Sequence, residues 1–268
     1  MRSLLSALAC LLLCGPAAAH EGPAAALDRL DRQVEEAPQD LETLLRRAEA
    51  RRRAGRHSEA LQDLDVASRL APDEPRVHAE RGLTLHAAGA EGAEAALDRY
   101  LEAVPDAPRV AALAARADIL LKTGRAAAAL VDLDAAISVA PNPDLCARRG
   151  EVHEGMGRFI AAAAGYRSCA AMLSGAVVLR LEAVRAERSA GRPDVALVDL
   201  EALLSERPRH PAWIILRSDL LDEVGREEEA RLERRRALGL VEGRLARRNS
   251  ARLRAWREAL LASLGSEP

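Results

Sequence analysis

The sequence predicts an all-α fold, a solenoid of about six helix-turn-helix units with a helical half-unit before them and a capping helix after them. Three regularities lead to this prediction. Glycines recur at intervals of 34, 35, 33, 34 and 34 residues, at Gly55, Gly89, Gly124, Gly157, Gly191 and Gly225. Small residues and leucines recur at fixed offsets from these glycines, and proline closes four of the units. A glycine on this schedule suits a tight turn with positive φ, made once in each unit.

The composition agrees with closely packed amphipathic helices. Of the 268 residues, 30% are charged and only 2% are aromatic. Small apolar residues with many charges favour helices that approach one another closely. The net charge of −2 argues against a protein that binds nucleic acid through its overall charge.

Residues 1–19 are predicted to be a signal peptide. A basic start at Met1-Arg2 precedes an apolar run from Leu4 to Leu13, which is too short to span a bilayer. Ala17-Ala18-Ala19 then gives the small-x-small pattern that signal peptidase recognises. We expect cleavage before His20 and a periplasmic or extracellular location in a bacterium. The alternatives are a lipid anchor at Cys14 and an unprocessed chain.

The mature chain is expected to begin and end with caps, because the open end of a solenoid exposes a core face. Residues 20–40 form the N-terminal capping helix, with its helical part from Ala24 to Glu36. Six units follow over residues 41–241, at about 41–74, 75–107, 110–142, 143–176, 177–210 and 211–241. Residues 242–268 form an arginine-rich C-terminal cap, one helix from Glu242 to Leu264. Five of its residues are expected to face the stack: Leu245, Leu253, Trp256, Leu260 and Leu261.

Two positions in each unit predict how its helices pack. The residue seven before the glycine is small in most units, namely Ala48, Gly82, Ala117, Gly150, Val184 and Ser218. The residue at the position nine after it is large, namely Leu64, Leu97, Leu133, Tyr166 and Leu200, with the second unit one residue shorter. Small residues let two antiparallel helices approach, and the large ones fill the seam. Proline then ends four units, at Pro72, Pro105, Pro141 and Pro208.

This pattern resembles the tetratricopeptide repeat family over roughly residues 41–241. The sequence departs from the family where an early tryptophan is usual, with Leu44, Val77 or His78, Leu113, Cys146, Arg180 and Ile214 in its place. It also has Arg234 where the sixth unit usually has a large apolar residue. The resemblance implies a right-handed superhelical solenoid and a non-catalytic scaffold or adaptor, which binds a protein or peptide partner in its concave groove.

Charged residues recur with the same period. Arginine stands eight residues before the glycine in five units, at Arg47, Arg81, Arg116, Arg149 and Arg217. In three units an acidic residue follows sixteen positions later, and an antiparallel hairpin brings these two positions together. We therefore predict the ion pairs Arg47–Asp63, Arg116–Asp132 and Arg217–Glu233, which fix the register of the helices.

Cys146 and Cys169 lie on the two helices of one unit, at similar distances from the turn. This placement and an oxidising compartment predict a disulfide between them. Two buried thiols and a redox-active pair are the alternatives.

The inner faces of the first helices are predicted to form the partner-binding groove. The candidate residues are Glu49, Arg52, Arg53, Leu83, His86, Asp118, Lys122, Glu151, Glu154, Arg185, Arg188, Asp219 and Asp222. One interpretation is a charge-banded groove for an extended peptide. The other is that neighbouring bands neutralise each other, Glu151 with Arg185 and Arg188 with Asp222.

The sequence offers little for catalysis or metal binding. It has no phosphate-binding loop, nucleophile elbow or zinc motif, so we predict no enzyme, no cofactor and no metal site. The alternative function is a periplasmic metal or redox protein that uses a mature N-terminal His20 or the two cysteines. The stretch from Arg231 to Glu258 is rich in arginine and is interpreted as the solvated face of a cap. Its alternative is a surface that contacts anionic lipid, polyanionic glycan or nucleic acid, and export argues against nucleic acid.

Overall fold

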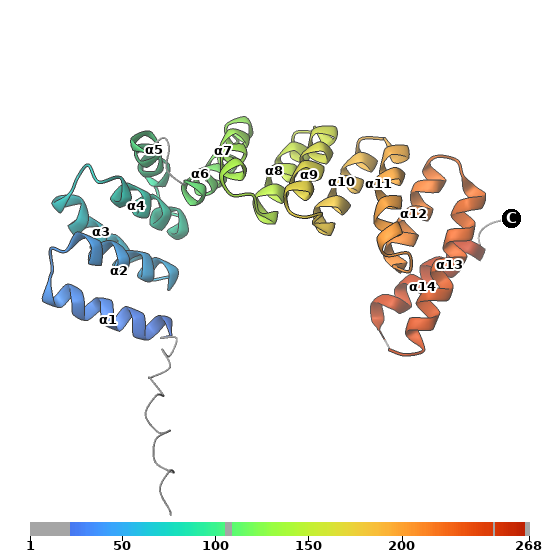
Figure 1. The fold of residues 1–268 in the computed structure, drawn as a ribbon, viewed down its shortest axis with the longest axis horizontal. Helices are drawn as coiled ribbons and strands as arrows, with labels where there is room; N and C mark the ends of the chain where they lie inside the picture. Colours follow the sequence, from blue (N-terminus) through green and yellow to red (C-terminus); the bar gives the residue numbers. More distant parts are fainter. Residues whose placement is uncertain (1–21, 105–108, 249, 266–268) are drawn as a thin grey trace, which may run out of the picture. The chain divides into compact units, whose positions relative to one another are not determined.

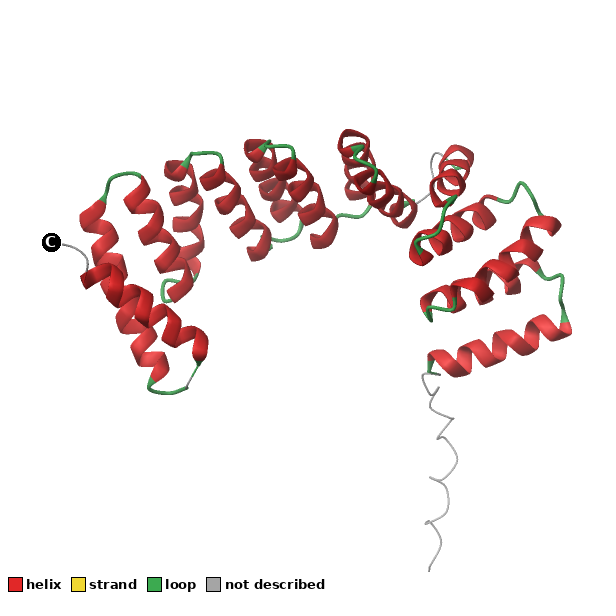
Figure 2. Ribbon diagram, turned by 180° about the vertical axis from the view of Figure 1, so that it is seen from behind, coloured by secondary structure: helices red, strands yellow, loops and turns green. Residues whose placement is uncertain are grey.

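A computed structural model describes residues 22–104, 109–248 and 250–265. The secondary structure of these residues is α-helical, with fourteen helices and no strand (Figure 2). None of these helices is both long and apolar enough to cross a membrane. The predicted signal peptide, His20, Cys14 and Pro105 lie outside the described residues.

The chain divides into two compact bodies, Met1–Ala107 and Pro108–Pro268. The N-terminal body contains α1 (Pro23–Glu36), α2 (Leu41–Arg53), α3 (His57–Leu70), α4 (Pro75–Ala88) and α5 (Ala93–Ala103). The C-terminal body contains α6 (Val110–Lys122), α7 (Ala126–Val139), α8 (Pro143–Gly155), α9 (Phe159–Met172), α10 (Val177–Ser189), α11 (Pro193–Glu206), α12 (Pro211–Glu223), α13 (Glu227–Leu245) and α14 (Ala251–Gly265). Within each body, consecutive helices pack side by side as hairpins (Figure 1).

The predicted all-α solenoid of helix-turn-helix units is confirmed. Six hairpins pair α2 with α3, α4 with α5, α6 with α7, α8 with α9, α10 with α11, and α12 with α13. Each turn glycine lies between the two helices of its hairpin, with φ between 64° at Gly89 and 75° at Gly124. The amide after Gly55 donates to the carbonyl of Arg51 at 2.8 Å, and the other five turns repeat this bond. Such a bond closes a helix that is followed by a residue in the left-handed conformation, which glycine adopts without a Cβ clash.

Local sequence explains where α2, α4, α8 and α12 begin, each the first helix of its hairpin. Asp40 and Asn142 accept hydrogen bonds from the amides of Thr43 and Leu145, at 3.1 and 3.0 Å, and so cap α2 and α8. Proline occupies the first position of α4, α8 and α12, where its missing amide hydrogen costs no bond.

The seam of each hairpin is built from the two positions that the sequence singled out. The leucines nine residues after the turn are fully buried, and so are Ala48 and Ala117 opposite them. The fourth hairpin uses another combination, because the ring of Tyr166 lies against Gly150.

The three predicted ion pairs are present. Arg47 Nη2 lies 2.6 Å from Asp63 Oδ1, Arg116 Nη2 lies 2.6 Å from Asp132 Oδ1, and Arg217 Nη1 lies 2.9 Å from Glu233 Oε1. Arginines at this position, eight residues before the turn glycine, also pair with the second helix of the preceding hairpin. These pairs are Arg81–Asp65, Arg149–Asp134 and Arg217–Glu201. These arginines therefore hold neighbouring hairpins together as well as the two helices of one hairpin.

The predicted disulfide joins Cys146 on α8 to Cys169 on α9. The two Cα atoms are 6.0 Å apart, and both side chains are fully buried. The bond therefore crosses the seam of the fourth hairpin, the one in which Gly150 and Tyr166 replace the usual alanine and leucine.

The C-terminal end differs from its prediction. The single helix expected from Glu242 to Leu264 is wrong, because α13 continues to Leu245 and α14 begins only at Ala251. Ala237 and Val241 are buried and extend the core contact of α13, and Ser250, a residue type preferred before a helix, precedes α14. Leu260 is buried in the core, and Leu245, Leu253 and Trp256 pack on it as expected, whereas Leu261 is 42% exposed.

Arg234 fits its unusual position through an ion pair. Its side chain is only 13% exposed and pairs with Asp222 of α12. An acidic partner on the facing helix thus replaces the apolar contact that the repeat pattern predicted.

Candidate partner-binding surface

The predicted groove residues all lie on the first helices of the hairpins, a surface that we call the first-helix face. In the N-terminal body they lie on α2 (Glu49, Arg52, Arg53) and α4 (Leu83, His86). In the C-terminal body they lie on α6 (Asp118, Lys122), α8 (Glu151, Glu154), α10 (Arg185, Arg188) and α12 (Asp219, Asp222). Two pairs of consecutive first helices contact each other directly, α2 with α4 in the N-terminal body and α8 with α10 in the C-terminal body.

In the N-terminal body the charges of this face are largely paired. Arg52 Nε lies 2.6 Å from Glu80 Oε1, which ties α2 to α4, and Arg53 pairs with Glu49 at 2.7 Å within α2. Burial raises the pKa of Glu80, and Arg52 acts in the opposite direction. Glu80 was not among the predicted groove residues, although it lies on α4 as Leu83 and His86 do.

In the C-terminal body neighbouring charges also neutralise one another, but not in the pairs that the sequence predicted. Arg188 pairs with Glu223, and not with Asp222, because Asp222 already faces Arg234 on α13. Arg185 pairs with Glu182 at 2.6 Å, one turn away in its own helix, and not with Glu151.

A further pair spans two hairpins of this body. Asp118 of α6 pairs with Arg148 of α8. Asp219 of α12 is partly buried, and this burial raises its pKa against the attraction of Arg188 and Arg234. Much of the predicted charge pattern thus serves the contacts between first helices.

Four charged groove residues remain without an ion pair in the part of the chain that the structure describes: Lys122, Glu151, Glu154 and Asp219. Glu154 is half-buried and accepts a hydrogen bond from the hydroxyl of Tyr166. Burial raises the pKa of Glu154, and the nearby Glu182 and Glu151 raise it further. Together Glu151, Glu154 and Glu182 form an acidic cluster across α8 and α10.

The position of this cluster depends on the fourth hairpin. A Cβ at Gly150 would lie 2.1 Å from Cζ of Tyr166, so only glycine lets the phenol cross the seam from α9 to α8. The tyrosine is 2% exposed, and burial raises its pKa, so the hydroxyl keeps its proton as a donor to Glu154.

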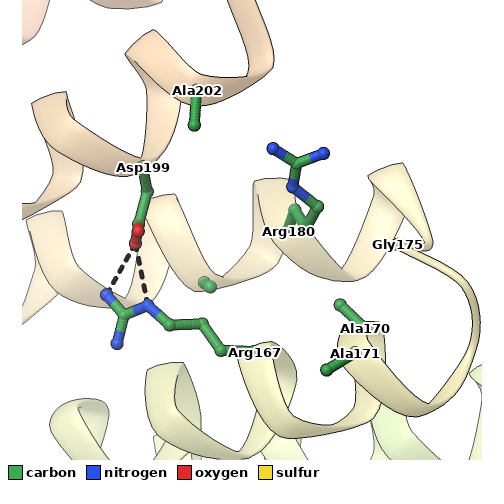
Figure 3. Close-up of a pocket in the computed structure, with 8 residues that line it drawn as sticks. Arg167, Ala170, Ala171, Gly175, Arg180, Asp199 and Ala202 are labelled. Carbon is green, nitrogen blue, oxygen red and sulfur yellow. Dashed lines mark hydrogen bonds and ion pairs between the residues drawn. The ribbon is translucent and has the colours of Figure 1, made fainter.

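A pocket of about 290 Å³ lies elsewhere, between α9, α10 and α11 (Figure 3). Its lining residues are Arg167, Ala170, Ala171, Gly175, Arg180, Ala183, Asp199 and Ala202. Arg167 donates to Asp199 Oδ2 from Nε at 2.9 Å and from Nη2 at 2.6 Å, and it also donates to Glu187 Oε1 at 2.6 Å. Arg180 pairs with Glu206 at 2.6 Å.

This pocket was not predicted from the sequence, although the residue pattern of the fifth unit indicates it. The fifth unit has an acid, Asp199, eight residues after its glycine, where the first and third units have Asp63 and Asp132. It has Ala183 in place of the arginine that would pair with that acid.

Nothing in the described ranges supports the alternative function. These residues contain no group of three or more His, Cys, Asp or Glu side chains that could hold a metal ion. The two cysteines are bonded to each other and buried, and His20 falls in the part of the chain that is not described.

No protein-family profile matches the sequence, and a search of curated proteins finds no relative. Solved structures with the same fold are found. The C-terminal part of a TPR repeat-containing protein from Cytophaga hutchinsonii aligns with 87% of this chain and 94% of its own, at 14% identity and a TM-score of 0.63.

Two further structures extend the comparison. PilW, a type IV pilus biogenesis factor, aligns with 69% of this chain and 86% of its own, at 15% identity and a TM-score of 0.54. A tetratricopeptide repeat protein from Parabacteroides merdae aligns with 89% of this chain and 92% of its own, at 16% identity and a TM-score of 0.50. The fold of this chain is therefore the all-α fold of the tetratricopeptide repeat proteins.

Proposed function

We propose that the protein is an exported scaffold or adaptor that binds a protein or peptide partner along its first-helix face and catalyses no reaction. The acidic cluster of Glu151, Glu154 and Glu182 carries this proposal. Glu151 is exposed and has no ion pair among the described residues, while Tyr166 donates to the half-buried Glu154. Carboxylates clustered in this way complement a partner segment that carries lysine or arginine.

The ion pairs of the first-helix face also support the proposal that it binds a partner. Pairs such as Arg52–Glu80 and Arg188–Glu223 tie consecutive first helices together, and a rigid surface loses less entropy on binding than a mobile one. The fold itself is compatible with many functions, so the site and not the fold carries the argument.

Export is supported by two observations. The N-terminal pattern of basic, apolar and small residues is typical of a signal peptide. The buried disulfide of Cys146 and Cys169 suits an oxidising compartment.

PilW, which has the same fold, is a pilus biogenesis factor, an example of this fold serving an assembly process.

The binding proposal is tested by affinity capture from the envelope fraction with the full exported chain, followed by mass spectrometry. The Glu151→Arg variant reverses the exposed charge of the cluster and should lose the captured partner. The matched control is Glu102→Arg, which reverses an exposed acid at the end of α5, away from the first-helix face. Equal capture by both variants and the parent protein would refute a role for the cluster.

Export is tested separately by cell fractionation and N-terminal sequencing. We expect a mature chain that starts at His20 and leaves the cytosol. A chain that keeps Met1 and remains in the cytosol would refute export and leave the binding result unaffected.

A further inference from the structure

The pocket between α9, α10 and α11 occupies a position that the first hairpin fills with an arginine. Counted from Gly55, the turn glycine of the first hairpin, four positions carry one charge cluster: −24 (Asp31, on the preceding helix α1), −8 (Arg47), −4 (Arg51) and +8 (Asp63). Arg47 and Arg51 both bind both aspartates, with N–O distances from 2.6 to 3.1 Å. The cluster is neutral, and both arginine side chains are largely buried.

The fifth hairpin has different residues at the same four positions. They are Arg167 at −24, Ala183 at −8, Glu187 at −4 and Asp199 at +8. The sign is reversed at two positions and kept at one, and the arginine at −8 is replaced by alanine. The cluster therefore has two carboxylates and one guanidinium, where the first hairpin has two of each.

The missing side chain accounts for the empty space. Ala183 lines the pocket together with three more alanines, on α9 and α11, and Asp199 stands at one end (Figure 3). The volume of about 290 Å³ lies near the lower limit for ligand pockets. Its alanine walls suit the aliphatic stem of an arginine, which packs on apolar surface while its charged end stays polar.

The hydrogen bonds of this charge cluster leave one oxygen of Asp199 unused. Arg167 places both of its bonds to Asp199 on one oxygen, Oδ2. Glu187 is 1% exposed, and its Oε2 is buried without a hydrogen bond among the described residues. Arg192 approaches this oxygen only to 3.5 Å. Glu187 does not line the pocket, so the acceptor that the pocket offers is Oδ1 of Asp199, and a guanidinium is the donor best matched to carboxylates.

We propose that this pocket is a second recognition site, which receives an arginine side chain of a partner protein. The stem lies over Ala183, and the guanidinium donates to Oδ1 of Asp199, which Arg167 leaves unused. Arg180 does not offset this complementarity, because Glu206 neutralises it. Arginine is favoured over lysine because its planar fork matches the geometry of a carboxylate. The site shares no residue with the acidic cluster and does not depend on the proposed function.

The test is an NMR titration of the full folded chain with N-acetyl-arginine N-methylamide as the probe. We expect saturable shifts of the Ala183 and Ala202 methyl signals. The citrulline analogue has the same shape without the charge and should bind at least tenfold more weakly. Equal binding of both probes, or no shift at these methyl groups, would overturn the proposal. Tighter binding of N-acetyl-glutamate would also overturn it, because the pocket would then be an anion site.

Variants provide the second arm of the test. The Ala183→Arg variant supplies the missing side chain from within the chain and should abolish binding of the probe. Its matched control, Ala161→Arg, adds the same side chain to an exposed position of α9 outside the pocket and should bind as the parent does. If Ala183→Arg does not fold, Asp199→Asn takes its place, with an expected loss of at least tenfold in affinity. Unchanged binding in the folded pocket variant would reject the site.

Discussion

Gly150 of α8 and Tyr166 of α9 fit each other across the seam of the fourth hairpin. A Cβ added at position 150 would lie 2.1 Å from Cζ and 2.2 Å from Cε1 of the tyrosine ring. In the first and third hairpins the same two positions hold alanine and leucine. The exchange is therefore reciprocal, because a larger side chain on one helix is matched by a smaller one on the other.

This fit predicts that Gly150→Ala destabilises the protein. Alanine gains about 1 kcal/mol over glycine inside a helix, but overpacking against a rigid ring costs about 1–3 kcal/mol. The clash of 2.1 Å makes the second effect the larger one. Urea denaturation should therefore show a lower free energy of unfolding.

A double-mutant cycle provides the control for this prediction. In the Tyr166→Leu background the ring is absent, so Gly150→Ala should stabilise the protein and restore the alanine–leucine pair of the first and third hairpins. Destabilisation of equal size in both backgrounds would show that the ring is not the cause.

The pKa of Glu154 should depend on Tyr166. Burial and the neighbouring acids raise this pKa above 4.5, whereas the tyrosine hydroxyl lowers it by donating to the charged form. Removing that donor in Tyr166→Phe should raise the pKa of Glu154 further. Carboxyl ¹³C NMR measures it directly, and an unchanged or lower pKa would contradict the hydrogen bond.

The raised pKa of Glu154 also gives the stability a defined pH dependence. The folded protein holds this proton more tightly than the unfolded chain, so ionised Glu154 lowers the free energy of unfolding above its folded pKa. This loss is recovered as the pH falls through the folded pKa towards 4.5. The Glu154→Gln variant should lack this contribution when denaturation is measured across that range.

Reduction of the disulfide should weaken the exported protein. The two cysteines are 23 positions apart, and closing a loop of about this size contributes roughly 3 kcal/mol. Thermal unfolding should therefore occur at a lower temperature after reduction. In the Cys146→Ser/Cys169→Ser variant the reductant should have no effect. Mass spectrometry of the native protein should show two free thiols only after reduction.

The ion pair of Arg116 and Asp132 should contribute more than its exposed neighbour. The Asp132 side chain is 4% exposed, and its loss in Asp132→Ala would leave a partly buried guanidinium without its carboxylate, at a cost of about 3 kcal/mol. Asp134→Ala on the same helix removes a carboxylate that is 59% exposed and should cost about 0–1 kcal/mol. Similar losses for the two variants, measured in urea, would contradict this ranking.

The sequence predicted contacts within a hairpin better than contacts between hairpins. Arg116 and Asp132 lie at matched distances from one turn, so the antiparallel geometry alone brings them together. Arg188 had several acids within one helical turn on the next hairpin, and the choice of Glu223 depended on Arg234, which occupies Asp222. Such competition depends on side-chain reach, which spacing does not encode.

The end of the array and the pocket were missed for different reasons. The break before Ala251 lies in an arginine-rich stretch whose period continues across it, so the pattern alone suggested one helix. The pocket arises from a side chain that is absent at Ala183, and a search for recurring residues does not detect an absence. The candidate partner residues were placed on the correct helices, but the pairing of their charges required coordinates.

The Gly150–Tyr166 fit and the substituted cluster of the fifth hairpin show that the six hairpins are not interchangeable parts. The fourth pairs glycine with tyrosine where the first and third pair alanine with leucine, and the fifth meets an arginine from its predecessor where the first meets an aspartate. Exchanging these two blocks, or duplicating one of them, would bring mismatched neighbours together. The contacts between neighbouring hairpins thus fix their order, so exchanging whole repeats should lower the free energy of unfolding more than single substitutions on the exposed faces do.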